Sequence, residues 1–182
     1  MRQLFATSNA VTTFMDSRGV CGPMVCAWFR ALKELRAAGN AGAGVQSVEE
    51  LGPTGWLVLA QHVAIRRDRA ALLRRYQLQE TGRTEFFALP SGNQRKFSMP
   101  ALAEATNAPG YHYVSVASFS TDDDLEMHAV GVWSRADRVQ FLDPNAGAYE
   151  FNGAMEFNTT FATWFSDHFG VEIVSGDVLH VQ

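Results

Sequence analysis

The sequence has too few cysteines for a disulfide framework and no apolar run long enough to span a membrane. Only Cys21 and Cys26 occur among its 182 residues. If both lie in one helix, their Cα atoms are about 8–9 Å apart, which is too far for a disulfide bond. We therefore expect two free thiols, as is typical of a reducing compartment. The N-terminus also lacks the charged and apolar regions of a secretory signal peptide.

Positive charge is scarce as well. The formal net charge of -4 at pH 7 argues against a nucleic-acid-binding protein. One basic cluster is interpreted as a solvated helix face, with a patch for phosphate or an acidic partner as the less favoured alternative; it comprises Arg66, Arg67, Arg69, Arg74 and Arg75. With 47% hydrophobic and 19% charged residues, the composition is that of an ordinary globular protein. We expect residues 1–182 to form a single domain.

Helical patterns come first along the chain and strand patterns follow. Apolar spacing predicts a helix from Gly22 to Ala38, a helical region from Gly55 to Gln79 with a break near Asp68, and a short helix in SMPALAEATN. Later segments rich in β-branched and aromatic residues predict strands at 111–119, 125–133 and 138–143, then a helix at 157–169 and two closing strands in VEIV and DVLHV. This order indicates an α+β domain in which a helical layer packs on an antiparallel sheet.

Cys21 is expected at the start of the first helix. Pro23 fits only a first turn, because deeper in a helix it would remove a hydrogen bond. A thiol at this place faces free backbone N–H groups and the positive end of the helix dipole, and both favour the nucleophilic thiolate. Cys26 lies further into the helix, where we expect an inert core thiol. Because free cysteines are often buried, a core thiol is also the alternative for Cys21.

His128 is the histidine for which the sequence supplies a carboxylate partner. If residues 134–137 form a hairpin turn, Trp133 pairs with Arg138, and His128 lies opposite Asp143 on the same sheet face. Their Cβ atoms would then be about 4.5–5.5 Å apart. A carboxylate at that place fixes the tautomer of the imidazole and stabilises the imidazolium, as in a catalytic triad.

Pro144, Asn145 and Gly147 are expected to form a turn that holds Asp143 at the end of its strand. A surface His–Asp pair of little energetic value is the alternative. Together with a thiol at a helix N-terminus, the pair instead indicates a Cys–His–Asp site.

Three short blocks follow one another between about residues 14 and 152: GVCGPMVCAWF, HAVGVW and FLDPNAG. In order and spacing they resemble the YopT/AvrPphB family of cysteine proteases, which are bacterial effectors. The resemblance implies a papain-like fold, with Cys21 as nucleophile, His128 as general base and Asp143 as its orienting group. It implies a protein or peptide substrate and neither a cofactor nor a metal. It also implies a virulence protein or toxin that a specialised bacterial system secretes without a Sec signal and that acts in the cytoplasm of a target cell.

The chain departs from this family in two respects. Papain-like enzymes carry an amide side chain a few residues before the cysteine, which helps to form the oxyanion hole, whereas here that place holds Asp16. An ionised carboxylate would repel an oxyanion, so Asp16 is a poor substitute for the amide. We assign the hole to the position of Asp16 and the backbone N–H of Cys21, with Asn9 or Gln3 as further donors. Secondly, 20 residues precede Cys21, fewer than in relatives, which gives the appearance of a bare catalytic domain.

Three other functions are compatible with the sequence. A papain-like site can also catalyse deamidation, amide hydrolysis in peptidoglycan, or leader-peptide cleavage. The chain can be a binding module that has lost activity, which Asp16 favours. Zinc binding by Cys21, Cys26 and His128 is the least favoured, because their spacing matches no compact ligand pattern.

Overall fold

The structure is a computed structural model that describes residues 1–7, 20–40, 42, 44–65, 68–88, 96–119, 125–168 and 173–182. Its helices are α1 (Cys21–Ala37), the 3-10 helix η3 (Glu49–Leu51), α2 (Thr54–Ile65), α3 (Arg69–Arg75), α4 (Met99–Asn107) and α5 (Ala154–His168). Its strands are β1 (Arg2–Ala6), β2 (Glu80–Glu85), β3 (Phe87–Ala88), β4 (Lys96–Phe97), β5 (Gly110–Phe119), β6 (Leu125–Ser134), β7 (Val139–Asp143), β8 (Gly147–Phe151) and β9 (Ile173–Val181).

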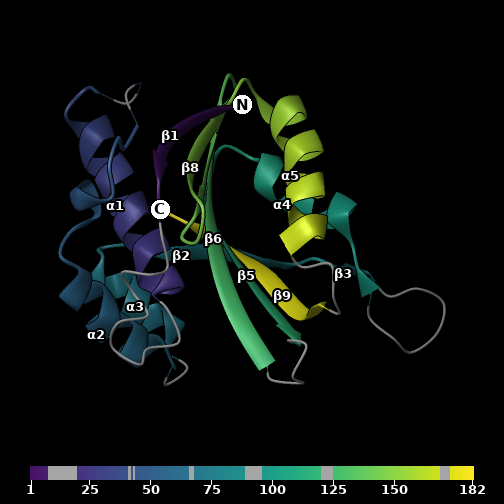
Figure 1. The fold of residues 1–182 in the computed structure, drawn as a ribbon, viewed down its shortest axis with the longest axis horizontal. Helices are drawn as coiled ribbons and strands as arrows, with labels where there is room; N and C mark the ends of the chain where they lie inside the picture. The colour runs from purple at the N-terminus through teal and green to yellow at the C-terminus, as the bar shows by residue number, and fades with distance from the viewer. Residues whose placement is uncertain are drawn as a thin grey trace.

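A seven-stranded antiparallel sheet forms the centre of the fold, in the order β1-β8-β7-β6-β5-β9-β2. Helices α1, α2 and α3 lie on one side of this sheet, and α4 and α5 lie on the other (Figure 1). One apolar cluster joins α1 to the sheet, and a second, rich in phenylalanine, joins α5 to it. The predicted combination of helices and an antiparallel sheet is therefore confirmed, with an additional helical layer on the second face.

Helix α1 has clear start and stop signals. It begins at Cys21, with Pro23 in the first turn, where its missing N–H costs no hydrogen bond. It ends before Gly39, whose φ of 79° is a left-handed conformation that glycine adopts without strain. The N–H of Asn40 then donates to the carbonyl of Leu35 at 2.8 Å. The sequence predicted this helix to within one residue at each end.

Side-chain caps set the starts of two other helices. Asp68 accepts a hydrogen bond from the N–H of Ala71 at 2.7 Å, so the break predicted near this residue is the N-cap of α3. Ser98 caps α4 in the same way, by accepting from the N–H of Ala101 at 3.3 Å. These two caps explain why α2 and α3 are separate helices and why α4 begins where it does.

Three expectations about the strands were wrong. The expected order, with helices first, misses β1, which precedes α1 and pairs with β8, and it also misses β2 and β8. The two closing strands are one continuous strand, β9. Parts of these strands lie at sheet edges, where partners far away in the sequence define the strand and the local pattern is weak.

The expected register of the hairpin was also wrong, by two residues. Trp133 pairs with Gln140 rather than with Arg138, because residues 135–138 form the turn and the N–H of Arg135 donates to the carbonyl of Arg138 at 2.8 Å. Side chains alternate along a strand with a period of two, so this shift leaves His128 and Asp143 on the same face. Their relation becomes diagonal rather than directly opposed.

Arg69 does not belong to a solvated helix face, contrary to the interpretation of the basic cluster. Its guanidinium donates to the carboxylate of Asp177 at 2.7 Å and to the hydroxyl of Ser115 at 3.1 Å. The N-terminus of α3 therefore lies against β5 and β9. Arg74 and Arg75 are exposed as expected, whereas Arg66 and Arg67 lie outside the described residues.

Helix α1 packs closely on the sheet at Gly131 of β6. A Cβ atom at this position would lie 2.9 Å from two ring atoms of Trp28 and 3.1 Å from Val25. Both side chains are fully buried. Gly131 therefore allows the helix to pack directly on the strand that carries His128.

We expect Gly131→Ala to lower the free energy of unfolding by about 1–3 kcal/mol, because the added methyl group overlaps the Trp28 ring in a packed core. Urea denaturation monitored by circular dichroism measures this change. Gly55→Ala in α2 is the matched control: nothing lies within 4 Å of its Cβ position, so stability should stay unchanged or rise by up to about 1 kcal/mol. An unchanged stability of the Gly131 variant would contradict the close packing.

Candidate active site

Cys21 is the first residue of α1, and its sulfur lies against β6. The sulfur accepts hydrogen bonds from His128 and from the backbone N–H groups of Ala129 and Gly22. Burial acts to raise the pKa of the Cys21 thiol, but these bonds and the charge of His128 outweigh it, so the pKa is lowered. The site therefore favours the thiolate, which is the nucleophilic form.

His128 bridges the thiol and a carboxylate. Its Nε2 lies 2.9 Å from Oδ1 of Asp143, which leaves Nδ1 to face the sulfur of Cys21. Burial acts to lower the pKa of His128, but hydrogen bonds and charges from Asp143 and Cys21 raise it to about 9. The imidazole therefore lies between the Cys21 thiol and the Asp143 carboxylate with a pKa above neutrality.

Asp143 is fully buried at the end of β7. Its Oδ1 also accepts a hydrogen bond from the N–H of Asn145 at 2.9 Å, as expected for the turn that follows it. Thr7 donates to the carbonyl of Asp143 at 3.3 Å and ties the strand end to the segment after β1. The second carboxylate oxygen, Oδ2, is buried and has no hydrogen-bond partner within the part of the chain that the structure describes. The residue is thus held in one place by its turn and by His128.

Cys26 differs from Cys21 in every respect that matters for reactivity. It is fully buried in the apolar cluster between α1 and the sheet. Burial raises the pKa of its thiol far above the ordinary value. Cys26 is therefore an unreactive core thiol, as the sequence predicted, and both cysteines are free.

Other histidines take part in contacts elsewhere or face solvent. His112 is buried in β5, where its Nδ1 lies 3.1 Å from Nδ1 of His180 and its Nε2 donates to the carbonyl of Ala108. Burial lowers the pKa of His112 to about 4. His62 is exposed on α2. Within the described ranges, no three histidine, cysteine or acidic side chains converge to hold a metal ion, and no helix there is long and apolar enough to cross a bilayer.

Of the residues considered for an oxyanion hole, the structure describes Gln3 and Cys21. Asp16 and Asn9 lie outside the described residues. Gln3 is exposed in β1, and its Nε2 lies 3.2 Å from the place of a Cβ at Gly147. In the first turn of α1, the first backbone hydrogen bond of the helix is donated by the N–H of Met24 to the carbonyl of Val20, at 2.9 Å. The N–H of Cys21 comes before this residue and therefore has no hydrogen-bond acceptor within the helix.

Two contacts at the site were not predicted from the sequence. The N–H of Ala129 bonds to the Cys21 sulfur because α1 lies across β6, and a backbone donor leaves no signal in the sequence. The hydroxyl of Tyr113 lies 2.7 Å from the place of a Cβ at Gly22. Glycine next to the thiol is therefore a signal of close packing that the sequence did offer.

We expect iodoacetamide to alkylate Cys21 and to leave Cys26 unmodified in the folded protein. At pH 6.5 the rate at Cys21 should exceed that of the urea-unfolded thiols by about tenfold or more, because an ordinary thiol is almost fully protonated there. Peptide mass spectrometry after timed quenching measures both rates. Asp143→Asn removes the anion that raises the pKa of His128, so the upper inflection of the rate profile should move to a pH below about 9. Equal labelling of both cysteines would contradict the arrangement.

Comparisons with known proteins identify a shared fold. No protein-family model matches the sequence, and no curated protein is similar to it. Among solved structures, the chain is similar to the Pseudomonas avirulence protein AvrPphB, with a TM-score of 0.59 at 12% sequence identity, over 98% of this chain and 97% of that chain. At this identity the likeness concerns the fold alone, and it extends over nearly the whole of both chains.

Proposed function

We propose that this protein is a papain-like cysteine protease in which Cys21, His128 and Asp143 form the catalytic triad. The observation that carries the proposal is the continuous set of hydrogen bonds from the sulfur through the imidazole to a buried carboxylate. The three motif blocks resemble the YopT/AvrPphB cysteine proteases, and the fold shared with AvrPphB supports the same assignment.

The mechanism begins from the thiolate–imidazolium pair. The Cys21 thiolate attacks the carbonyl carbon of an amide bond and forms a tetrahedral intermediate. The N–H of Cys21 donates to the developing oxyanion, and the positive end of α1 stabilises its charge. His128 donates its proton to the leaving amine, and the C–N bond breaks to give a thioester. His128 then takes a proton from water, which attacks the thioester and releases Cys21.

Asp143 acts through His128 in this mechanism. Its carboxylate holds Nε2 and thereby keeps Nδ1 directed at the sulfur. Because Oδ1 is also fixed by Asn145, the imidazole cannot turn without breaking a bond to a buried carboxylate. The low exposure of the pair, 15% for the His128 side chain and 1% for that of Asp143, strengthens this interaction relative to one in water.

The proposed substrate is a protein of a target cell, cleaved by a secreted bacterial effector. Motif resemblance and the shared fold with a Pseudomonas avirulence protein support this part of the proposal. A reducing cytoplasm as the place of action agrees with two free cysteines.

The test is proteome-wide detection of new protein N-termini after the protein is added to a eukaryotic cell lysate. The wild type should create a small set of new N-termini, and Cys21→Ala should abolish them. His128→Ala and Asp143→Asn should slow cleavage by about 10²–10⁴-fold, the contribution of general acid–base catalysis. His62→Ala, which changes an exposed histidine of α2 outside the proposed triad, is the matched control and should retain full activity.

The same samples distinguish cleavage from deamidation. Deamidation adds about one dalton to a side chain without creating a new N-terminus, and intact-mass and peptide analysis detect it. Modification of that kind, dependent on Cys21, would preserve the triad and overturn the protease assignment. Absence of any Cys21-dependent product would overturn the proposed enzyme function.

A further inference from the structure

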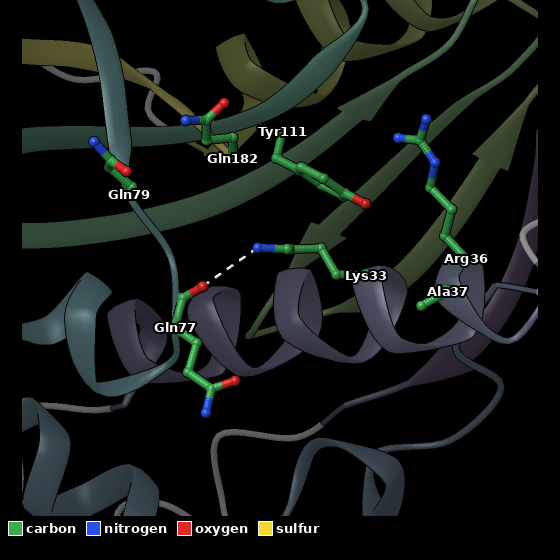
Figure 2. Close-up of a pocket in the computed structure, with 7 residues that line it drawn as sticks. All are labelled: Lys33, Arg36, Ala37, Gln77, Gln79, Tyr111 and Gln182. Carbon is green, nitrogen blue, oxygen red and sulfur yellow. Dashed lines mark hydrogen bonds between the residues drawn. The ribbon is translucent and has the colours of Figure 1, made fainter.

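A cavity of about 690 Å³ lies at the end of α1 that is remote from Cys21. Its lining, drawn in Figure 2, consists of Lys33, Arg36, Ala37, Gln77, Gln79, Tyr111 and Gln182. Lys33 and Arg36 follow Cys21 by 12 and 15 residues, or about 18 and 22 Å along the helix axis. The volume lies within the range of small-molecule sites in proteins, about 300–1,000 Å³. This cavity is therefore separate from the candidate active site.

Two cationic groups face this cavity from one side of α1. The Nζ of Lys33 donates to the carbonyl of Gln77 at 3.3 Å (Figure 2). Among the described residues, neither Lys33 nor Arg36 forms a salt bridge, whereas the neighbouring Arg30 pairs with Glu34 at 2.8 Å. No lining residue carries an acidic side chain. Lys33 and Arg36 thus bring positive charge to the cavity that no acidic side chain of its lining neutralises.

The two cations are not needed to cap α1. The backbone already satisfies the last turn, because the N–H groups of Ala38, Gly39 and Asn40 donate to the carbonyls of Glu34, Arg36 and Leu35. A role confined to the helix terminus therefore does not account for both side chains.

Tyr111 supplies a hydroxyl that is already oriented. The residue is 6% exposed and lines the cavity, and its buried hydroxyl lies beside the guanidinium of Arg36. Its ring is held between Phe29, at 5.4 Å between centroids, and Trp133, at 6.0 Å. Burial raises the pKa of Tyr111, although the nearby Arg36 acts against it. The hydroxyl therefore stays protonated and able to donate a hydrogen bond.

The opposite side of the cavity presents carboxamides. The main chains of Gln79 and Gln182 are joined by a pair of hydrogen bonds, each 3.0 Å long. Their side chains lie across from Lys33 in Figure 2. Carboxamides both donate and accept hydrogen bonds, so they suit the neutral polar groups of a ligand.

We propose that this cavity is a binding site for a small molecule that carries an oxyanion, either a phosphate or a carboxylate, together with neutral hydrogen-bonding groups. Lys33 and Arg36 pair with the anion, the Tyr111 hydroxyl donates to one of its oxygens, and the two carboxamides contact the rest of the ligand. The inference does not depend on the function assigned to Cys21.

The test uses the ¹⁵N-labelled protein at pH 7, titrated separately with inorganic phosphate and with citrate at constant ionic strength. We expect saturable shifts of backbone amide signals of the lining residues with at least one of the two anions. Saturation by phosphate or by citrate alone identifies the preferred oxyanion. Shifts that never saturate with either anion would overturn the proposal.

Variants distinguish specific binding in the cavity from nonspecific electrostatic attraction of the anion to the protein surface. Arg36→Ala should weaken binding of the saturating anion by about tenfold, the loss of a charge-assisted contact. Tyr111→Phe keeps the ring in place and should weaken binding several-fold. Arg30→Ala, on the same helix but outside the cavity, removes the same charge and should change affinity by less than twofold. An equal loss for Arg30→Ala and Arg36→Ala would also overturn the proposal.

Discussion

The packing of α1 on β6 is the constraint on which the candidate site depends. Trp28 lies over Gly131 so closely that a methyl group has no room between them. Cys21 is two helical turns before Trp28, and Ala129 is two residues before Gly131, so one rigid contact fixes the sulfur beside its partners on the strand. A helix that moved away from Gly131 would separate the thiol from both His128 and the N–H of Ala129.

Local signals predicted the helices better than the strands. Pro23, Asp68 and Ser98 each mark a helix start through chemistry that is readable in a few neighbouring residues. By contrast, β1 has five residues and exists because β8 lies beside it. Pairing between segments far apart in the sequence cannot be predicted from either segment alone. The position of the hairpin turn, for which the predicted register was wrong by two residues, could not be predicted from its local sequence either.

In the candidate site, too, some features could be predicted from the local sequence and others depend on long-range packing. The choice of Cys21 over Cys26 followed from helix position. The choice of Asp143 as the partner of His128 followed from strand alternation, which survives a register error of two residues but not of one. By contrast, the backbone N–H of Ala129 donates to the Cys21 sulfur, and the Arg69 guanidinium donates to Asp177. Both contacts arise from the packing of helices on the sheet, which the sequence does not specify residue by residue. The oxyanion hole remains a prediction, because Asp16 and Asn9 lie outside the described residues.

The thiolate–imidazolium pair has a consequence for how stability depends on pH. In the folded state the pKa of His128 is raised and the pKa of Cys21 is lowered, so both shifts favour a thiolate–imidazolium pair. Taken alone, the raised pKa of His128 would stabilise the fold below about pH 6.5 and lose that effect as pH rises through about 9. The lowered pKa of Cys21 acts in the opposite direction. Between about pH 6.5 and 9, the ordinary pKa values of the two groups, folding that forms the ion pair moves a proton from sulfur to nitrogen and exchanges none with solvent, so in this range the pair adds no slope to the stability curve.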